Sequence, residues 1–246
     1  MKIWMNPLRF MLVSLLMSQV LWSAPNPKKE IPEPAVMQQQ VWRNMRLLDY
    51  QMEGAMRTED SLHPILLRTR GKLMIYEFKK QPLQIRVYFL SSGSILWRRS
   101  NSNQEWEMIE GRKRLEKILD SDISYEDLGV DFLRWSTITK VGGDSINTLD
   151  AWAYEAVPPI VSNYAKLRFW ISSQYLALLR ADAYNKLGQA IKRVQINGVM
   201  KVGDGYVMKE LEVKTLRPGT DLSISRSFIE IRNAKSGSGI PIDYQI

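Results

Sequence analysis

The sequence predicts an α+β protein that is mainly antiparallel β: a half-open, curved β-barrel with an N-terminal helix and a helical lid in its concavity. Two patterns predict the strands and helices: period-two apolar patterning recurs in about eleven short segments, whereas helical spacing appears in about two places. A third observation predicts the curvature, because several strands are apolar on both faces. A single sheet of this size must curl on itself or be covered.

The expected strands form a meander whose members are separated by turn residues. Asn185 to Gly188 and Asp204-Gly205 are typical of hairpin turns, and Gly142 to Asp144 also indicates a turn. No repeat or internal boundary interrupts the pattern, so we expect residues 25–246 to form one domain. The expected strands span residues 50–56, 73–78, 83–90, 95–98, 106–109, 149–157, 164–171, 175–184, 189–196 and 220–231, with another strand after Gly205.

The first expected helix lies just after a proline-rich linker. Met37, Val41, Met45 and Leu48 recur at helical spacing, and Pro34 suits the first turn. We therefore expect an amphipathic helix at the start of the mature domain.

The second expected helix lies in residues 121–135, SDISYEDLGVDFLRW, called here the lid segment. Ser124 and Asp127 have the spacing of a capping box, and Ile123 and Leu128 have that of a hydrophobic staple. An apolar stripe then follows at helical spacing. Two interpretations stay open: a helix packed permanently on the sheet, or a lid over an apolar cavity. The stripe consists of Tyr125, Leu128, Phe132 and Trp135.

The N-terminus has the pattern of a secretory signal peptide. Lys2 and Arg9 flank the apolar run 10–21, which is short for a membrane span. We expect residues 1–24 to be the signal peptide, with cleavage after Ser23 or Ala24; an uncleaved anchor is the alternative. The chain has no cysteine, which excludes disulfides, thiol catalysis and a lipid-modified cysteine. An exported protein without cysteine fits a bacterial periplasm.

The sequence offers little for catalysis. It contains no GxSxG, Walker, GxGxxG or HExxH motif, and its one histidine, His63, precedes a proline. We therefore expect no enzyme activity, no catalytic residues, no metal and no cofactor. The net charge of +8 suits acidic partners or an anionic membrane surface, but the basic residues are scattered along strands, and nucleic acid is not expected as a partner.

With these features in place, the chain resembles the outer-membrane lipoprotein-sorting proteins, the LolA/LolB-like superfamily. The lid segment is similar to the family's TDLTYEDL…FLYW, and the likeness continues through residues 151–159, 164–193 and 204–213. Asp182, Asn185 and Gln189 depart from the usual Glu, Asp and Lys. The matching positions are Tyr164, Lys166, Trp170, Arg180, Tyr184, Gly188 and Lys192.

The resemblance implies a LolA-like half-closed barrel with an apolar concavity and a helical lid. It further implies a periplasmic carrier that binds lipoprotein acyl chains or free lipid for transfer toward the outer membrane. An inner-membrane transporter would be the donor and an outer-membrane protein the acceptor. The alternative is an envelope sensor on the same scaffold, with a lipid or protein partner.

The expected lipid-binding residues come from the lid and from two strands. Carriers of this kind also use an arginine that contacts the lid from inside the cavity, and Arg68, Arg86 and Arg168 are all candidates for it. The expected lid residues are Tyr125, Leu128, Phe132, Leu133 and Trp135, and the expected wall residues are Ile85, Val87, Phe89 and Trp170.

Overall fold

The computed structural model describes residues 30–44, 47–100, 103–203 and 205–240, in which thirteen strands form one antiparallel sheet. The expected signal peptide and its cleavage site lie outside the described residues. The strands are β1 (Leu47–Arg57), β2 (Leu62–Gly71), β3 (Leu73–Phe78), β4 (Leu83–Leu90), β5 (Gly93–Arg99), β6 (Glu107–Met108), β7 (Thr139–Ile146), β8 (Leu149–Ala156), β9 (Lys166–Ser172), β10 (Leu178–Tyr184), β11 (Ala190–Val202), β12 (Gly205–Leu216) and β13 (Ser223–Ser236). The helical elements are α1 (Pro34–Asn44), η1 (Gly111–Leu115), α2 (Tyr125–Gly129) and η2 (Asp131–Arg134).

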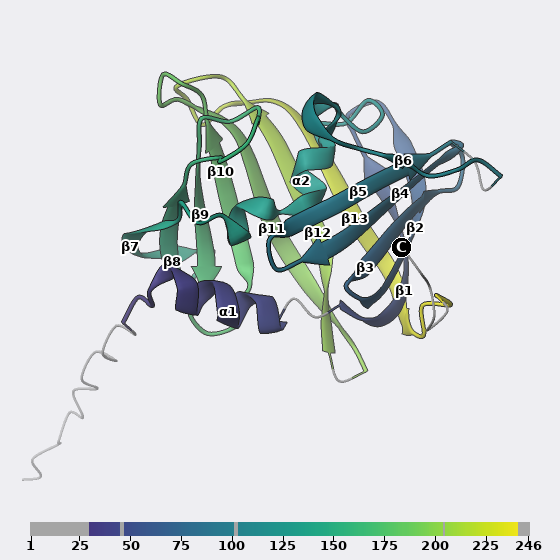
Figure 1. Ribbon diagram of the computed structural model, residues 1–246, viewed down its shortest axis with the longest axis horizontal. Helices are drawn as coiled ribbons and strands as arrows, with labels where there is room; N and C mark the ends of the chain where they lie inside the picture. Colours follow the sequence, from purple (N-terminus) through teal and green to yellow (C-terminus); the bar gives the residue numbers. More distant parts are fainter. Residues whose placement is uncertain (1–29, 45–46, 101–102, 204, 241–246) are drawn as a thin grey trace, which may run out of the picture.

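The order of the strands explains why the lid segment crosses the sheet. β1 pairs with β13, so the two ends of the meander meet within the sheet, and β6 and β7 become its two edges. The chain between β6 and β7 must therefore pass from one edge to the other, and α2 lies inside the curve of the sheet (Figure 1). The predicted fold class, a curved antiparallel sheet that does not close, is confirmed.

Two strands were not predicted. β2 alternates buried and less buried residues, but Pro64, Arg68 and Arg70 on its outer face hide the pattern in the sequence. β7 runs through Gly142 and Gly143, where a turn was expected. The chain turns instead at Asn147 and Thr148, whose φ angles are 47° and 69°.

The first helix is shorter than predicted. It ends at Asn44, and Leu48 is an exposed residue of β1 rather than part of the helix. The Asn185 hairpin is confirmed, since the amide of Gly188 donates to the Asn185 carbonyl at 3.0 Å. β11 and β12 pair from Val202 and Gly205 onward, whereas Asp204 of the second expected turn lies outside the described residues.

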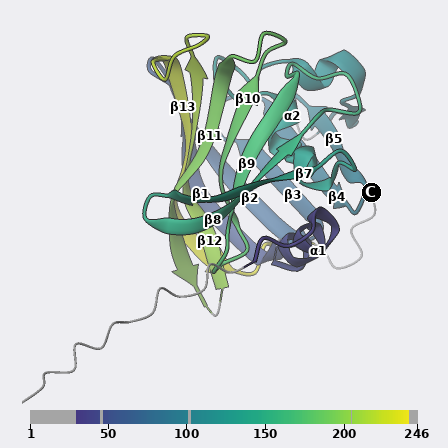
Figure 2. The ribbon, with the colours of Figure 1, turned by 90° about the vertical axis from the view of Figure 1, so that its left-hand side faces the viewer.

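The concave face of the sheet carries two apolar clusters, each completed by a different part of the lid segment. One gathers side chains from β1–β5 and β11–β13, and the other gathers side chains from β8–β10 together with Met37 and Val41 of α1. α1 lies across one end of the strands, below α2, and Figure 2 shows the curled sheet from the side. Among the described residues, no helix is both long enough and apolar enough to cross a membrane.

Candidate ligand-binding site

The lid segment consists of two short helical turns rather than the single helix that was predicted. α2 ends at Gly129, Val130 adopts the left-handed conformation with φ 43° and ψ 36°, and η2 follows. A Cβ built on Gly129 would lie 2.4 Å from Ser94 Oγ of β5, so the backbone at the end of α2 is in close contact with the sheet. The break redirects the second turn toward the other half of the concavity.

The predicted start of α2 is confirmed. The amide of Ser124 donates to Asp127 Oδ2 at 2.7 Å, as a capping box requires. Ile123 and Leu128, the expected staple residues, are both buried in the first apolar cluster. Local sequence signals were therefore sufficient for this part of the lid segment.

The two turns of the lid segment fill different halves of the concavity. Tyr125 and Leu128 of α2 join the first cluster, which also contains the predicted wall residues Ile85, Val87 and Phe89. Phe132, Leu133 and Trp135 join the second cluster. The rings of Phe132 and Phe169 of β9 lie 5.3 Å apart. The structure thus brings the predicted lid residues and these wall residues onto the concave face.

Trp170 does not lie with them. It belongs to a separate cluster with Ala153 and Leu179, and its Nε1 donates to Asp144 Oδ2 at 2.8 Å. Because alternate residues of a strand point to opposite faces, Phe169 on the concave face places Trp170 on the convex one. The expectation that Trp170 lines the cavity is therefore wrong.

The same alternation places the three candidate arginines. Arg68 and Arg168 pair with Glu77 and Glu155 on neighbouring convex positions, and Arg86 stacks on Trp106 at 4.0 Å. Their strand neighbours Leu67, Val87 and Phe169 face the concave clusters. Cations that do contact the lid segment include Lys192, Arg114, Lys117 beside Asp122, and Arg98, which lies 5.9 Å from the centre of the Tyr125 ring. Period two could have excluded the three arginines, but no local signal marks Lys192 or Arg114.

Residues 118–124, called here the lid root, hold the segment to the sheet through neutral donors and buried apolar side chains. Ile118 and Ile123 are fully buried. Asp122 Oδ1 accepts from Thr215 and Ser225 at 2.6 Å each, and the Ser227 hydroxyl donates to Oδ2 at 3.1 Å. Burial alone would raise the pKa of Asp122, but these hydroxyls and the nearby Lys117 outweigh it and lower the pKa below its usual value.

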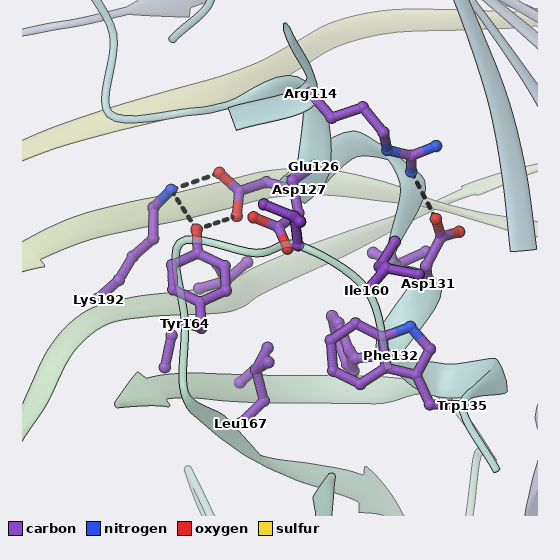
Figure 3. A pocket seen from close by; sticks show the side chains of 15 residues that line it. Arg114, Glu126, Asp127, Asp131, Phe132, Trp135, Ile160, Tyr164, Leu167 and Lys192 are labelled. Atoms are coloured by element: carbon purple, nitrogen blue, oxygen red, sulfur yellow. Dashed lines mark hydrogen bonds and ion pairs between the residues drawn. The ribbon is translucent and has the colours of Figure 1, made fainter. Parts of the chain in front are cut away.

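Residues 125–135, called here the lid body, add buried charged contacts to the apolar ones described above. Asp127, Tyr164 and Lys192 form a buried triangle, the latch, in which Tyr164 OH donates to Asp127 Oδ1 at 2.8 Å and accepts from Lys192 Nζ at 2.9 Å (Figure 3). Lys192 also pairs with Asp127 Oδ2. Burial, aided by the Asp127 and Glu126 carboxyls, raises the pKa of Tyr164 well above its usual value.

Two other carboxyl groups of the lid body, those of Glu126 and Asp131, are buried, and burial disfavours their charged forms. Burial raises the pKa of Glu126, although the Ser162 hydroxyl donates to it. Burial also raises the pKa of Asp131, even though Arg114 and Arg134 both pair with this carboxylate. Figure 3 shows the Arg114–Asp131 pair beside the latch. Desolvation thus outweighs pairing at both carboxyls.

A small cavity remains between the lid body and β9–β11. Its volume is about 30 Å³, similar to the share of one water molecule in the liquid. An acyl chain is far larger, so it can enter only if the lid body moves. The cavity is lined by the latch together with Arg114, Glu126, Val130, Asp131, Phe132, Trp135, Ile160, Val161, Leu167, Ala181, Ala183 and Val194.

Comparison with known proteins agrees with this architecture. Residues 75–244 match the model of a family described as "Uncharacterized protein". The chain belongs to that family. The sequence matches no curated protein.

Solved structures show the same fold. A domain named for outer-membrane lipoprotein sorting, from Vibrio parahaemolyticus, is 13% identical with a TM-score of 0.69, over 85% of this chain and 94% of that one. A DUF1329 family protein from Desulfovibrio piger is 16% identical with a TM-score of 0.67, over 85% and 93%. A LolA superfamily protein from Nitrosomonas europaea is 13% identical with a TM-score of 0.58, over 83% and 94%. The expected resemblance to lipoprotein-sorting proteins is therefore confirmed for the fold.

Proposed function

We propose that the protein is a carrier in the bacterial periplasm that binds an acyl chain beneath the lid body, for transfer toward the outer membrane. The chain would belong to a lipoprotein or a free lipid, the donor would be an inner-membrane transporter, and the acceptor would lie at the outer membrane. One observation carries the proposal: an extended apolar concave wall is covered by a short segment that packs apolar side chains on it and is also held by buried ion pairs.

Exchange of the lid body for an acyl chain would replace one set of apolar contacts on the wall with another. Each CH₂ group buried against the apolar wall contributes roughly 0.8 kcal/mol. A buried ion pair such as Asp127–Lys192 adds little net stability, because desolvation offsets most of the attraction. A lid held by such pairs covers the wall without water entering and can still be displaced by a long apolar ligand.

The lid can be locked to test the proposal. The chain has no cysteine, and a Cβ at Gly129 would lie 2.4 Å from Ser94 Oγ, so cysteines at these two positions are close enough to form a disulfide. We expect the oxidised Ser94→Cys/Gly129→Cys protein to lose most of its binding of a fluorescent fatty acid, and a reductant to restore it. Each single-cysteine variant, treated with the same reagents, is the control.

Two results would contradict the proposal in different ways. Equal binding by the oxidised and reduced double variant would show that the lid does not gate the cavity. Absence of acyl-chain binding by the wild type would remove the carrier function. Native mass spectrometry of protein purified from the periplasm then identifies the cargo from its mass, and finding no processed protein there would contradict export.

A binding function rather than catalysis also agrees with the position of the histidine. His63 Nε2 lies 2.6 Å from Asp120 Oδ1, beside the lid root rather than in the cavity. We expect His63→Gln to bind acyl chains as the wild type does. Loss of function in a folded His63→Gln protein would favour an enzyme instead.

A further inference from the structure

Arg134 of η2 is a buried cation whose hydrogen-bonding capacity is only partly used. Its side chain is 5% exposed, and Nη1 donates to the Gly129 carbonyl and to Asp131 Oδ1, both at 3.1 Å. Its Nε and Nη2 atoms are buried and have no hydrogen-bond partner among the described residues. Burying such donors unpaired is costly, which makes the arrangement informative.

The charges around Arg134 do not balance. Asp131 pairs with both Arg134 and Arg114, so one carboxylate is shared by two guanidinium groups. Burial lowers the pKa of Arg134 despite the attraction of Asp131. The cluster therefore carries one positive charge more than its own acid neutralises, and an anion would complete it.

Arg134 also lines a second cavity, which lies between α1 and η2. Its volume is about 170 Å³, several times the ~30 Å³ share of one water. The guanidinium carbon lies 4.7 Å from the Trp42 ring and 5.3 Å from the Phe89 ring, and contact with two aromatic rings restricts where the guanidinium can lie. Gln39 and Ser91 are exposed at the rim. The cavity thus has a positioned cation and an opening.

Two other arginines of this chain show what the unused atoms can bind. Arg180 donates from Nε and Nη2 to the two oxygens of Asp182, with Nε at 2.8 Å. Arg193 uses the same pair of atoms on the same carboxylate, at 2.9 and 3.1 Å. This planar fork fits the paired oxygens of a carboxylate or a phosphate.

We propose that the cavity between α1 and η2 binds one oxyanion, a carboxylate or a phosphate, on the guanidinium of Arg134, whose buried Nε and Nη2 atoms are reached once the side chain shifts toward the cavity. The anion has two sources: the head group of an acidic lipid, or a free small anion. The lipid source rests on the proposed function, since the acyl chain would then lie beneath the neighbouring lid body. The free-anion source does not depend on it.

The experiment compares ligands that share one chain and differ in charge. Palmitate and monopalmitoylglycerol are titrated in parallel, together with acetate and inorganic phosphate as free anions. The proteins are the wild type, Arg134→Gln, Arg134→Lys, and Arg168→Gln as a convex-face control. Arg134→Lys keeps the charge beside Asp131 but lacks the fork, and it serves as the test if Arg134→Gln does not fold. Thermal unfolding of each variant establishes folding.

We expect wild type to prefer palmitate over monopalmitoylglycerol by about tenfold or more, and Arg134→Gln to lose that preference without losing the neutral lipid. Arg134→Lys should lose most of the preference, and Arg168→Gln none. Binding of acetate or phosphate that depends on Arg134 would identify a free-anion site. Unchanged binding of all three anions by folded Arg134 variants would overturn the proposal while leaving the carrier function intact. Arg134-dependent phosphate binding without any acyl-chain binding would support the anion site and contradict the carrier function.

Discussion

The lid root and the lid body are neighbours in sequence but are held to the sheet by different chemistry. The root places fully buried isoleucines in the core, and its buried Asp122 is surrounded by hydroxyl donors that favour its charged form. In the body, burial disfavours the charged forms of Glu126, Asp131 and Arg134. The root has the character of ordinary core, and the body has that of a segment whose burial is less favourable.

This difference assigns a role to each part. A moving lid needs one end that stays attached and another whose contacts can be exchanged for ligand or water. Charged groups regain hydration when they leave the sheet, which offsets part of the cost of opening. The apolar side chains of the root would gain no such favourable hydration if they left the sheet. We therefore expect opening to begin in the lid body and to leave the lid root in place.

Truncation of apolar side chains gives the largest expected effects. Ile123→Ala in the root should lower the free energy of unfolding by about 2–5 kcal/mol and leave acyl-chain affinity per folded molecule unchanged. Phe132→Ala in the body should lower it by less than the roughly 3–5 kcal/mol typical of core phenylalanines, and should change affinity more. Trp135→Ala should behave like Phe132→Ala. Denaturant unfolding and fatty-acid titration measure both quantities. A full core-sized loss at Phe132 with unchanged affinity would make the body permanent core.

Removal of the latch lysine is expected to have the next largest effect. Lys192→Met leaves the Asp127 carboxylate buried without its cation and should cost about 3 kcal/mol. Because the cost falls on the closed lid, acyl-chain affinity should rise. Lys166→Met removes a half-exposed pair with Glu155 on the convex face and is the control, with an expected loss below about 1 kcal/mol. Lower affinity in Lys192→Met would contradict the role of the latch.

Within the lid segment, contacts between residues close in sequence could be predicted, whereas contacts with residues elsewhere in the fold could not. The start of α2 follows from contacts within a few residues, the Ser124–Asp127 box and the Ile123–Leu128 staple, and it was predicted correctly. The break at Val130 lies next to the close approach of Gly129 to Ser94 of β5, a contact that local sequence signals do not reveal. Of the partners of the lid body, Arg114 lies 17 residues before Asp131 in the same connection between β6 and β7, whereas Lys192 belongs to β11. Only the path of that connection across the sheet brings Lys192 to the lid.

The acid of the root should show a specific pH dependence. Asp122→Asn should lower the free energy of unfolding at pH 7 by about 1.5–3 kcal/mol, since hydrogen bonds to a charged acceptor are lost. The folded-state pKa of Asp122 is lowered, so its contribution is present above the unfolded pKa of about 3.9 and is lost as the pH falls through the folded value. Wild type and variant should therefore converge only in strong acid. Denaturant unfolding across pH measures the difference.

Glu126 provides the opposite case in the lid body. Its pKa is raised, so the folded protein binds the proton more readily than the unfolded chain, and wild type should gain stability as the pH falls through that raised pKa. Glu126→Gln should therefore be no less stable than wild type at pH 7. The gain on acidification should be missing from the variant. If both acids shifted stability in the same direction, the contrast between root and body would be wrong.

The smallest expected effect concerns the backbone between the two helical turns. Val130 is a β-branched residue in the left-handed region, where such residues are rare, and glycine adopts this conformation without strain. Val130→Gly relieves roughly 1–2 kcal/mol of strain but loses a partly buried side chain, so its net effect on unfolding should stay below about 1 kcal/mol. Leu119→Gly in the lid root is the matched control, since Leu119 has φ 54° and packs on the first cluster. If the backbone at Val130 restrains the second turn within the moving body, its glycine variant should exchange amide hydrogens of residues 131–135 faster, and Leu119→Gly should not. Unchanged exchange in both variants would show that the Val130 backbone does not restrain this turn.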